Sequence, residues 1–94
     1  MEEVLHALGS PFRRRIMQLV RDRELSAGEL ASHFPYITRP AVSQHLAILK
    51  EVRLVQERRQ GTRRLYRTRR EPLIELRVFV ESFMGAWERP KRRR

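Results

Sequence analysis

The N-terminal part of the chain alternates apolar and polar positions at the spacing of two short helices. Apolar residues between positions 4 and 8 form one stripe, which Gly9 ends after about two turns. Ser10 and Pro11 suit the N-cap and first turn of a second helix, in which apolar residues recur at positions 12, 16, 19 and 20. We expect this second helix to end near Arg23.

The next segment carries the signals of two further helices separated by a tight turn. Ser26 and Glu29 form a capping-box pattern, and apolar residues follow it at helical spacing. The segment 35–37, Pro-Tyr-Ile, interrupts that spacing, and Thr38 can cap a fourth helix over 39–51. Two short helices across such a turn predict a helix-turn-helix, with 39–51 as its recognition helix.

The predicted recognition helix has one apolar face and one polar face. At 100° per residue, three apolar side chains lie close together and should pack inward: Val42, Leu46 and Leu49. The opposite face carries small and hydrogen-bonding groups that can enter a major groove. Gln suits adenine, Arg suits guanine and Ser suits either, so we expect base contacts from Arg39, Ser43 and Gln44. The alternative is an ordinary solvated helix surface.

Two strand-like segments, 54–58 and 63–67, follow this helix, and Gly61 supplies a positive φ in the loop 59–62 between them. They predict a fold that is mainly α with a small β-hairpin, a winged helix-turn-helix of five helices and a two-stranded wing over 54–68. Residues expected to contact phosphate or the minor groove are Thr38, Arg59, Gln60, Arg63 and Arg64. The alternative for the wing arginines is protection of an exposed edge strand.

A last helix begins at Glu71-Pro72 and carries more apolar surface than one small core needs. Its apolar residues follow a 3-4-3-4 spacing: Leu73, Leu76, Val80, Phe83 and Trp87. Such a stripe predicts a homodimer formed through this helix with help from the first one, the alternative being packing against the first helix of the same chain. We therefore expect one DNA-binding and dimerisation domain over 1–87 and a disordered basic tail over 88–94.

Charge is unevenly distributed over the 94 residues, whose formal net charge is +10. Residues 1–38 are balanced, with five basic and five acidic residues. Residues 39–70 carry ten basic residues against two acidic ones, a net charge of +8. An excess concentrated in the predicted recognition helix and wing favours double-stranded DNA as the partner.

Composition excludes several other classes of function. The chain has no cysteine, so thiol chemistry and thiolate metal sites are excluded. No apolar run reaches the roughly 20 residues of a membrane span and no signal peptide begins the chain, so we expect a cytoplasmic protein without a membrane partner. The three histidines, His6, His33 and His45, fall on different predicted elements, and no acid, base and nucleophile cluster together. We expect no enzyme activity, no metal and no cofactor. A protein-interaction module remains the second hypothesis.

Several segments together resemble the ArsR/SmtB-type bacterial winged-helix repressors from Val4 to about Trp87. Residues 8–16 (LGSPFRRRI) resemble the family's opening helix, 25–31 (LSAGELA) its next helix, and 40–50 (PAVSQHLAILK) its recognition helix. The resemblance implies a dimer that binds an imperfect inverted repeat near its own promoter. It also implies DNA contacts at Arg39, Ser43, Gln44 and His45.

The chain departs from this family at two places. Many relatives sense metals through cysteines before the turn, where this chain has Ala31, Ser32 and His33, or through His and Asp on the last helix, which has neither. The resemblance is therefore to a metal-independent branch, and it does not supply the inducer. Arg53 stands where relatives usually have Gly after the recognition helix. Either a positive φ at this position costs about 1 kcal/mol, or the helix ends differently.

Overall fold

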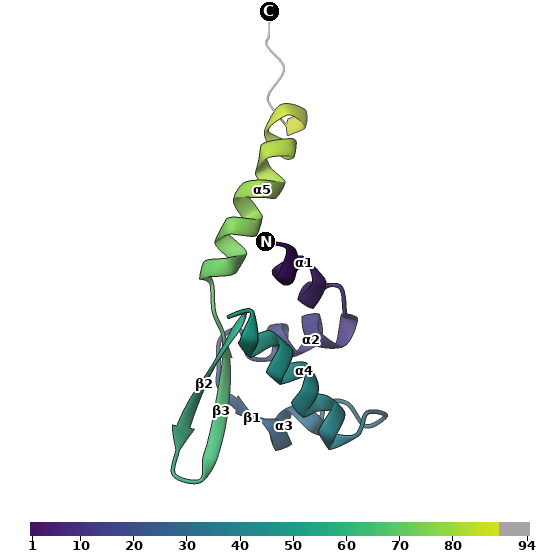
Figure 1. Ribbon diagram of the computed structural model, residues 1–94, viewed down its shortest axis with the longest axis vertical. Helices are drawn as coiled ribbons and strands as arrows, with labels where there is room; N and C mark the ends of the chain where they lie inside the picture. The colour runs from purple at the N-terminus through teal and green to yellow at the C-terminus, as the bar shows by residue number, and fades with distance from the viewer. Residues whose placement is uncertain (89–94) are drawn as a thin grey trace, which may run out of the picture.

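The computed structural model of the chain describes residues 1–88, which form five helices and a small antiparallel sheet (Figure 1). The predicted winged helix-turn-helix is confirmed. The elements in chain order are α1 (Glu2–Leu8), α2 (Pro11–Leu19), β1 (Leu25–Ser26), α3 (Ala27–Ala31), α4 (Arg39–Glu51), β2 (Val55–Gln60), β3 (Arg63–Thr68) and α5 (Glu71–Glu88).

Side-chain caps begin three of the helices where the sequence predicts them. Ser10 Oγ accepts from the Arg13 amide at 3.3 Å at the start of α2. Ser26 and Glu29 complete the capping box of α3, with the two hydrogen bonds at 3.1 and 2.8 Å. Thr38 Oγ1 accepts from the Ala41 amide at 3.2 Å at the start of α4. Each cap satisfies an amide that the first helical turn leaves without a backbone partner.

Helix α2 ends at Leu19, earlier than the predicted end near Arg23. The Val20 amide still donates to the Ile16 carbonyl at 3.1 Å, but the Val20 carbonyl accepts from the Thr68 amide at 3.0 Å. That contact with the end of β3 takes the place of a further helical hydrogen bond. The chain therefore leaves the helix to join the sheet.

The predicted hairpin wing is present as β2 and β3, but the sheet has three strands in the order β1-β3-β2, one more than the two predicted. The additional strand β1 pairs Leu25 with Tyr66 and Ser26 with Leu65. Two residues are too few to show an alternating pattern, and Ser26 also caps α3, so the sequence gives only the helix signal there. The wing turn is also shorter than predicted, because β2 extends to Gln60 and leaves Gly61, with φ of 64°, at the turn.

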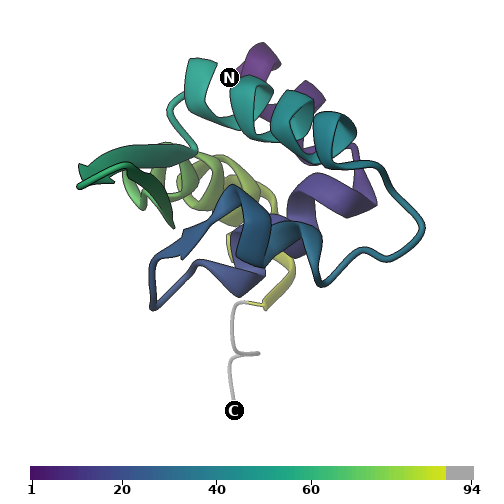
Figure 2. The ribbon, with the colours of Figure 1, turned by 90° about the horizontal axis from the view of Figure 1, so that it is seen from below.

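The core lies where the helix-turn-helix meets the base of the sheet. The inward residues predicted for α4 are confirmed, since Val42, Leu46 and Leu49 are at most 2% exposed. They pack in one cluster with side chains from α2, α3 and the start of the wing, of which the largest fully buried ones are Ile16, Val20, Leu30, Leu54 and Val55. Figure 2 shows α4 facing α2 and α3, with the β2–β3 hairpin projecting at one side.

The end of α4 is a Schellman motif with an arginine in the left-handed position. The Arg53 amide donates to the Lys50 carbonyl at 3.0 Å, and the Leu54 amide to the Leu49 carbonyl at 2.9 Å. Arg53 has φ of 64°, a conformation that glycine adopts without strain. The motif turns the chain directly from the recognition helix into β2.

Helix α5 extends away from the rest of the molecule, at the end opposite the hairpin tip (Figure 1). Leu73, near its start, packs against the core. The molecule measures 63 × 27 × 23 Å and has a radius of gyration of 16.6 Å, against about 13 Å for a compact domain of 100 residues. None of the helices within residues 1–88 has the length and apolar character needed to cross a membrane.

The C-terminal boundary differs from the prediction by one residue. Glu88 belongs to α5, although we expected the tail to start there. The remaining residues of the predicted tail, 89–94, lie outside the described part of the chain.

Candidate nucleic-acid interface

The polar face of α4 is open to solvent along the part of the helix that the sequence assigns to base contacts. Ser43 and Gln44 are exposed, as are Pro40 and Ala47 beside them, while the opposite face is buried in the core. The groups on this face are small or end in an amide or hydroxyl. A helix with such a face fits the width of a major groove, which is about 12 Å.

Thr38 and Arg39 lie at the N-terminal end of this face, and both are exposed. Thr38 Oγ1 accepts the Ala41 amide, which leaves the hydroxyl proton of Thr38 for another acceptor. The Arg39 guanidinium lies over Gly28 of α3, where a Cβ would come 3.4 Å from Arg39 Nη2. The two helices of the helix-turn-helix therefore meet closely at the residue expected to recognise guanine.

His45 differs from the other predicted base-contacting residues, because it is half-buried at the edge of the face. Its Nδ1 lies 3.2 Å from Nη1 of Arg13, and its ring stacks on Phe12 with 5.8 Å between the ring centroids. Burial, with the Arg13 charge as a second cause, lowers the pKa of His45 below its ordinary value. The structure thus groups Ser43 and Gln44 at an open face and His45 beside α2.

The register of the wing divides its predicted contact residues between two sides of the hairpin. Arg59 pairs with Arg64, and Gln60 pairs with Arg63. Directly paired residues of an antiparallel ladder face the same side, and neighbours along a strand face opposite sides. Arg59 and Arg64 therefore share one side, and Gln60 and Arg63 share the other. The positive charges of Arg59 and Arg64, directly opposite each other, repel, and an anion bound between them would relieve this repulsion.

Carboxylates of the loop after α2 and of α3 bind arginines along the wing. Glu24 accepts two hydrogen bonds from Arg58, at 2.6 and 2.8 Å, and Glu29 accepts one from Arg63 at 2.8 Å. The hydrogen bond from Arg58 lowers the pKa of Glu24, and those from Ser26 lower the pKa of Glu29. These ion pairs fix the direction of the hairpin relative to the helix-turn-helix.

Glu57 is the carboxylate that joins the wing to the recognition helix. It accepts a hydrogen bond from Lys50 of α4, and Arg64 Nε lies 3.3 Å from its other oxygen. The hydrogen bond from Lys50 is the main cause that lowers the pKa of Glu57. Among the wing arginines of the predicted site, Arg59 forms no salt bridge with a described residue. It is the cation best placed to bind a phosphate without first leaving a carboxylate.

Two features of this surface were missing from the sequence prediction. Tyr36, in the turn before α4, is 98% exposed, although large aromatic side chains are usually at least partly covered. Its position two residues before the Thr38 cap could have suggested it as a contact residue. Arg13 is buried at 9% exposure, whereas Arg14 and Arg15 are exposed. Its spacing of three and four residues from Ile16 and Met17 puts it on the buried face of α2, a signal that could have identified it.

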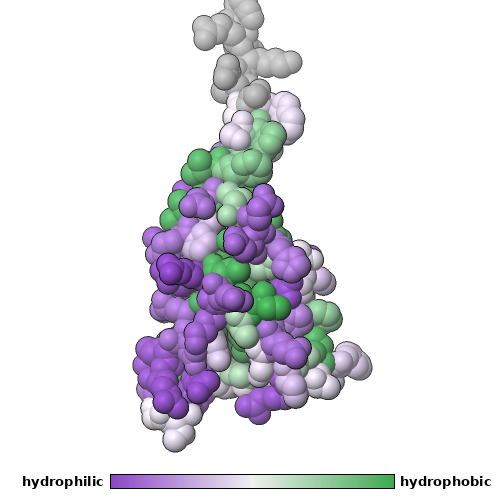
Figure 3. Space-filling model, in the orientation of Figure 1, coloured by the Kyte–Doolittle hydropathy of each residue, from purple (hydrophilic) through white to green (hydrophobic). Residues whose placement is uncertain are grey.

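The predicted dimerisation stripe on α5 divides into a covered start and an exposed remainder. Leu73 and Leu76 are half-buried, whereas Val80, Phe83 and Trp87 are 45%, 51% and 74% exposed. The Phe83 ring contacts both Phe79 and Trp87, with centroid distances of 5.2 and 6.4 Å. Figure 3 shows apolar surface over this projecting helix and hydrophilic surface over the hairpin.

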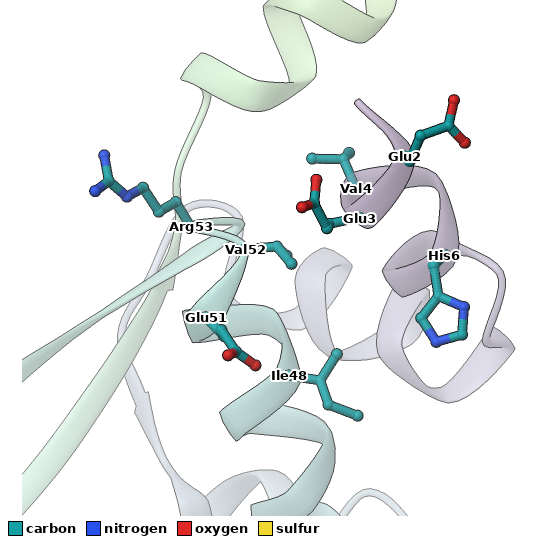
Figure 4. A pocket seen from close by; sticks show the side chains of 8 residues that line it. All are labelled: Glu2, Glu3, Val4, His6, Ile48, Glu51, Val52 and Arg53. Carbon is teal, nitrogen blue, oxygen red and sulfur yellow. The ribbon is translucent and has the colours of Figure 1, made fainter.

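A cleft with a volume of about 760 Å³ lies between α1 and the C-terminal end of α4 (Figure 4). Glu3 points across the gap from α1 toward Val52, whereas Arg53 points away from it. The other lining residues are Glu2, Val4, His6, Ile48 and Glu51. No three His, Asp or Glu side chains within residues 1–88 are grouped so that they could hold a metal ion. The cleft lies at the far end of α4 from the Thr38 cap.

Known proteins share both the sequence and this arrangement of elements. The family described as "Bacterial regulatory protein, arsR family" matches residues 10–57. The HTH-type transcriptional regulator Rv2034 of Mycobacterium tuberculosis is 44% identical over 77 residues, which are 82% of this chain and 71% of that protein. The transcriptional repressor SdpR of Bacillus subtilis is 38% identical over 61 residues, 65% of this chain and 67% of that protein.

A solved structure gives the same result for the fold. The ArsR-like transcriptional regulator from Rhodococcus sp. RHA1 superposes with a TM-score of 0.83 at 27% identity, over 94% of this chain and 80% of that one. The sequence resemblance to this family is therefore confirmed. With the exposed face of α4 and the basic wing beside it, the chain belongs to the ArsR family of DNA-binding bacterial regulatory proteins and is a winged helix-turn-helix transcriptional regulator.

Proposed function

We propose that the protein is a homodimeric repressor, acting also on its own gene, that binds an imperfect inverted-repeat operator in double-stranded DNA. Helix α4 enters the major groove of each half-site, where Arg39, Ser43, Gln44 and His45 contact base edges. The observation that carries this proposal is the exposed Ser43–Gln44 face opposite a fully buried apolar face on the same helix.

Phosphate contacts orient the recognition helix in this proposal. The Thr38 hydroxyl donates to a phosphate at the start of α4, and the wing bears Arg59, Gln60, Arg63 and Arg64 against the backbone or the adjacent minor groove. The net charge of +8 over residues 39–70 supports this role. Such contacts supply affinity that does not depend on base sequence, so specificity rests on α4.

A second copy of the chain covers the exposed part of α5 in this proposal. Val80, Phe83 and Trp87 are exposed on α5, and an inverted-repeat operator requires a two-fold dimer. A thiolate metal sensor cannot be built from this chain, because it contains no cysteine. We therefore assign no metal or cofactor to the repressor.

Replacing Gln44 with Ala tests the base-reading role. We expect affinity for a selected operator to fall about tenfold or more, and affinity for a random duplex at the same salt concentration to change little. Gln18→Ala is the matched control, because Gln18 is an exposed glutamine on α2 and should leave both affinities unchanged. An equal loss on operator and random duplex in the Gln44 variant would show that Gln44 does not read bases.

A further inference from the structure

Arg13 is a buried cation whose partners in the described chain are not carboxylates. Its Nε donates to the Ala7 carbonyl at 2.7 Å, and its Nη2 donates to the His6 carbonyl at 3.3 Å. Both carbonyls belong to the last turn of α1, where the helix dipole favours a positive charge, and the His6 carbonyl also accepts from the Gly9 amide at 3.1 Å. The guanidinium is thereby fixed at the junction of α1 and α2.

The remaining arm of Arg13 reaches the recognition helix. Its Nη1 lies 3.2 Å from His45 Nδ1. A guanidinium has only hydrogen-bond donors, so Nδ1 must be the acceptor and cannot carry a proton. His45 is therefore neutral, with its single proton on Nε2. The Phe12 ring, stacked at 27° to the imidazole plane, holds the ring from the same helix as Arg13.

The Nε2 atom of His45 is available to a ligand. It has no hydrogen-bond partner among the described residues, and no side-chain nitrogen or oxygen of that part of the chain is both buried and unpaired. Nε2 therefore reaches solvent. It does so on α4, directly after the exposed Ser43 and Gln44.

We propose that Arg13 is a positioning residue for DNA recognition: it holds His45 in the tautomer that presents an Nε2–H donor to a hydrogen-bond acceptor on duplex DNA. This inference rests on the proposed function. The acceptor is a guanine N7 or O6 edge or a phosphate oxygen, which share the same chemistry. Arg13 itself does not touch DNA, and its effect on binding passes through His45.

Protonation of His45 would oppose this arrangement. A proton on Nδ1 would face the Nη1–H of Arg13, and two positive charges would lie side by side. Arg13 is the charged group that acts on this ring, and the other ring contact, Phe12, does not titrate. Burial and the Arg13 charge lower the pKa of His45, so the ring stays neutral at pH 7 and accepts a proton only at more acidic pH.

Nitrogen-15 NMR of the His45 ring in the full chain tests whether Arg13 fixes the tautomer. At pH 7 we expect an unprotonated Nδ1 and a protonated Nε2 in a single tautomer. In Arg13→Met we expect both tautomers and a higher pKa, because the donor and the charge are lost. In Arg13→Lys, which keeps a donor and a charge, we expect the wild-type tautomer to remain dominant.

A double-mutant cycle tests whether Arg13 affects DNA binding through His45. Arg13→Met should lower affinity for a selected operator about tenfold, the value of one hydrogen bond. His45→Phe should cause a similar loss, and Arg13→Met should add little in the His45→Phe background. A residue needed only for folding would lower affinity by the same factor in both backgrounds. A loss on operator alone assigns the acceptor to a base edge, and an equal loss on random duplex assigns it to phosphate.

The outcomes separate this inference from the function on which it rests. A mixed tautomer or a protonated Nδ1 in wild-type chain that binds its operator would overturn the role of Arg13 alone. Independent, additive losses in the cycle would do the same. A wild-type chain that prefers no DNA sequence would overturn this inference and the proposed function together.

Discussion

Among single residues, Arg53 carries backbone strain, because it forms the Schellman turn with a φ of 64°. Replacing it with Gly should raise the free energy of unfolding by about 1 kcal/mol, because Gly adopts this conformation without a Cβ penalty. Arg53→Ala is the control, since it removes the same side chain and keeps the penalty. Urea unfolding measures the free energy of unfolding of the Gly and Ala variants. If the Gly variant is no more stable than the Ala variant, Arg53 is not strained.

Residues that act through local geometry were predictable from the sequence, and residues that act through distant contacts were not. The caps at Ser10, Ser26 and Thr38 bond amides only three residues away, so spacing alone indicates them. The Arg13 contact with His45 joins residues 32 positions apart. Helical spacing from Ile16 and Met17 puts Arg13 on the inward face of α2, but it does not identify the residue that Arg13 contacts. That partner depends on tertiary packing, which has no short-range pattern.

The wing, at the scale of elements, depends on its pairing register. The hairpin and Gly61 turn were predictable because two apolar pairs, Leu54-Val55 and Leu65-Tyr66, flank a polar segment that contains a glycine. Strand β1 was not, since it consists of two residues whose only partner is β3. The register also divides the contact residues into an Arg59–Arg64 side and a Gln60–Arg63 side, which composition alone cannot show.

Arg59→Ala tests the wing as a phosphate-binding element. Because Arg59 forms no salt bridge with a described residue, its loss leaves no carboxylate of that part unpaired, and stability should stay close to wild type. Affinity should fall equally for operator and random duplex, and the slope of log affinity against log salt should decrease in magnitude by about 1.

The matched control for the wing is Arg21→Ala, which removes an equal charge from the exposed segment after α2. Its salt slope should equal that of the wild type. A wild-type slope in Arg59→Ala, or a reduced slope in both variants, would mean that Arg59 binds no phosphate and that net charge alone governs affinity.

The whole molecule has the residues proposed to contact DNA at one end and its exposed apolar helix at the other. The 3-4 spacing on α5 predicted its apolar stripe. It did not predict that α5 would project beyond the core, because the direction of α5 depends on where the sheet ends and the helix begins. This separation allows two copies to join through α5 while both α4 helices remain open. The dimer itself stays a prediction.

Phe83→Asp tests the dimer, because it places a charge in the middle of the exposed stripe, where burial would be costly. We expect light scattering to show a fall from twice the chain mass to once. Val78→Asp is the matched control. Val78 is 60% exposed and lies on the opposite side of α5 at 100° per residue, so this variant should remain a dimer. A monomeric wild-type chain would instead favour a different protein as the partner of α5.

Selection of bound duplexes from a random pool tests whether a two-fold dimer reads DNA through α4, because it measures sequence preference and symmetry together. We expect enrichment of two inverted half-sites whose centres lie one helical turn, about 10 to 10.5 base pairs, or a multiple of it apart. In a parallel selection with Gln44→Ala, the preference should weaken at the same position in both half-sites. Enrichment of a single unpaired site, or of no sequence at all, would contradict a dimer that reads DNA through α4.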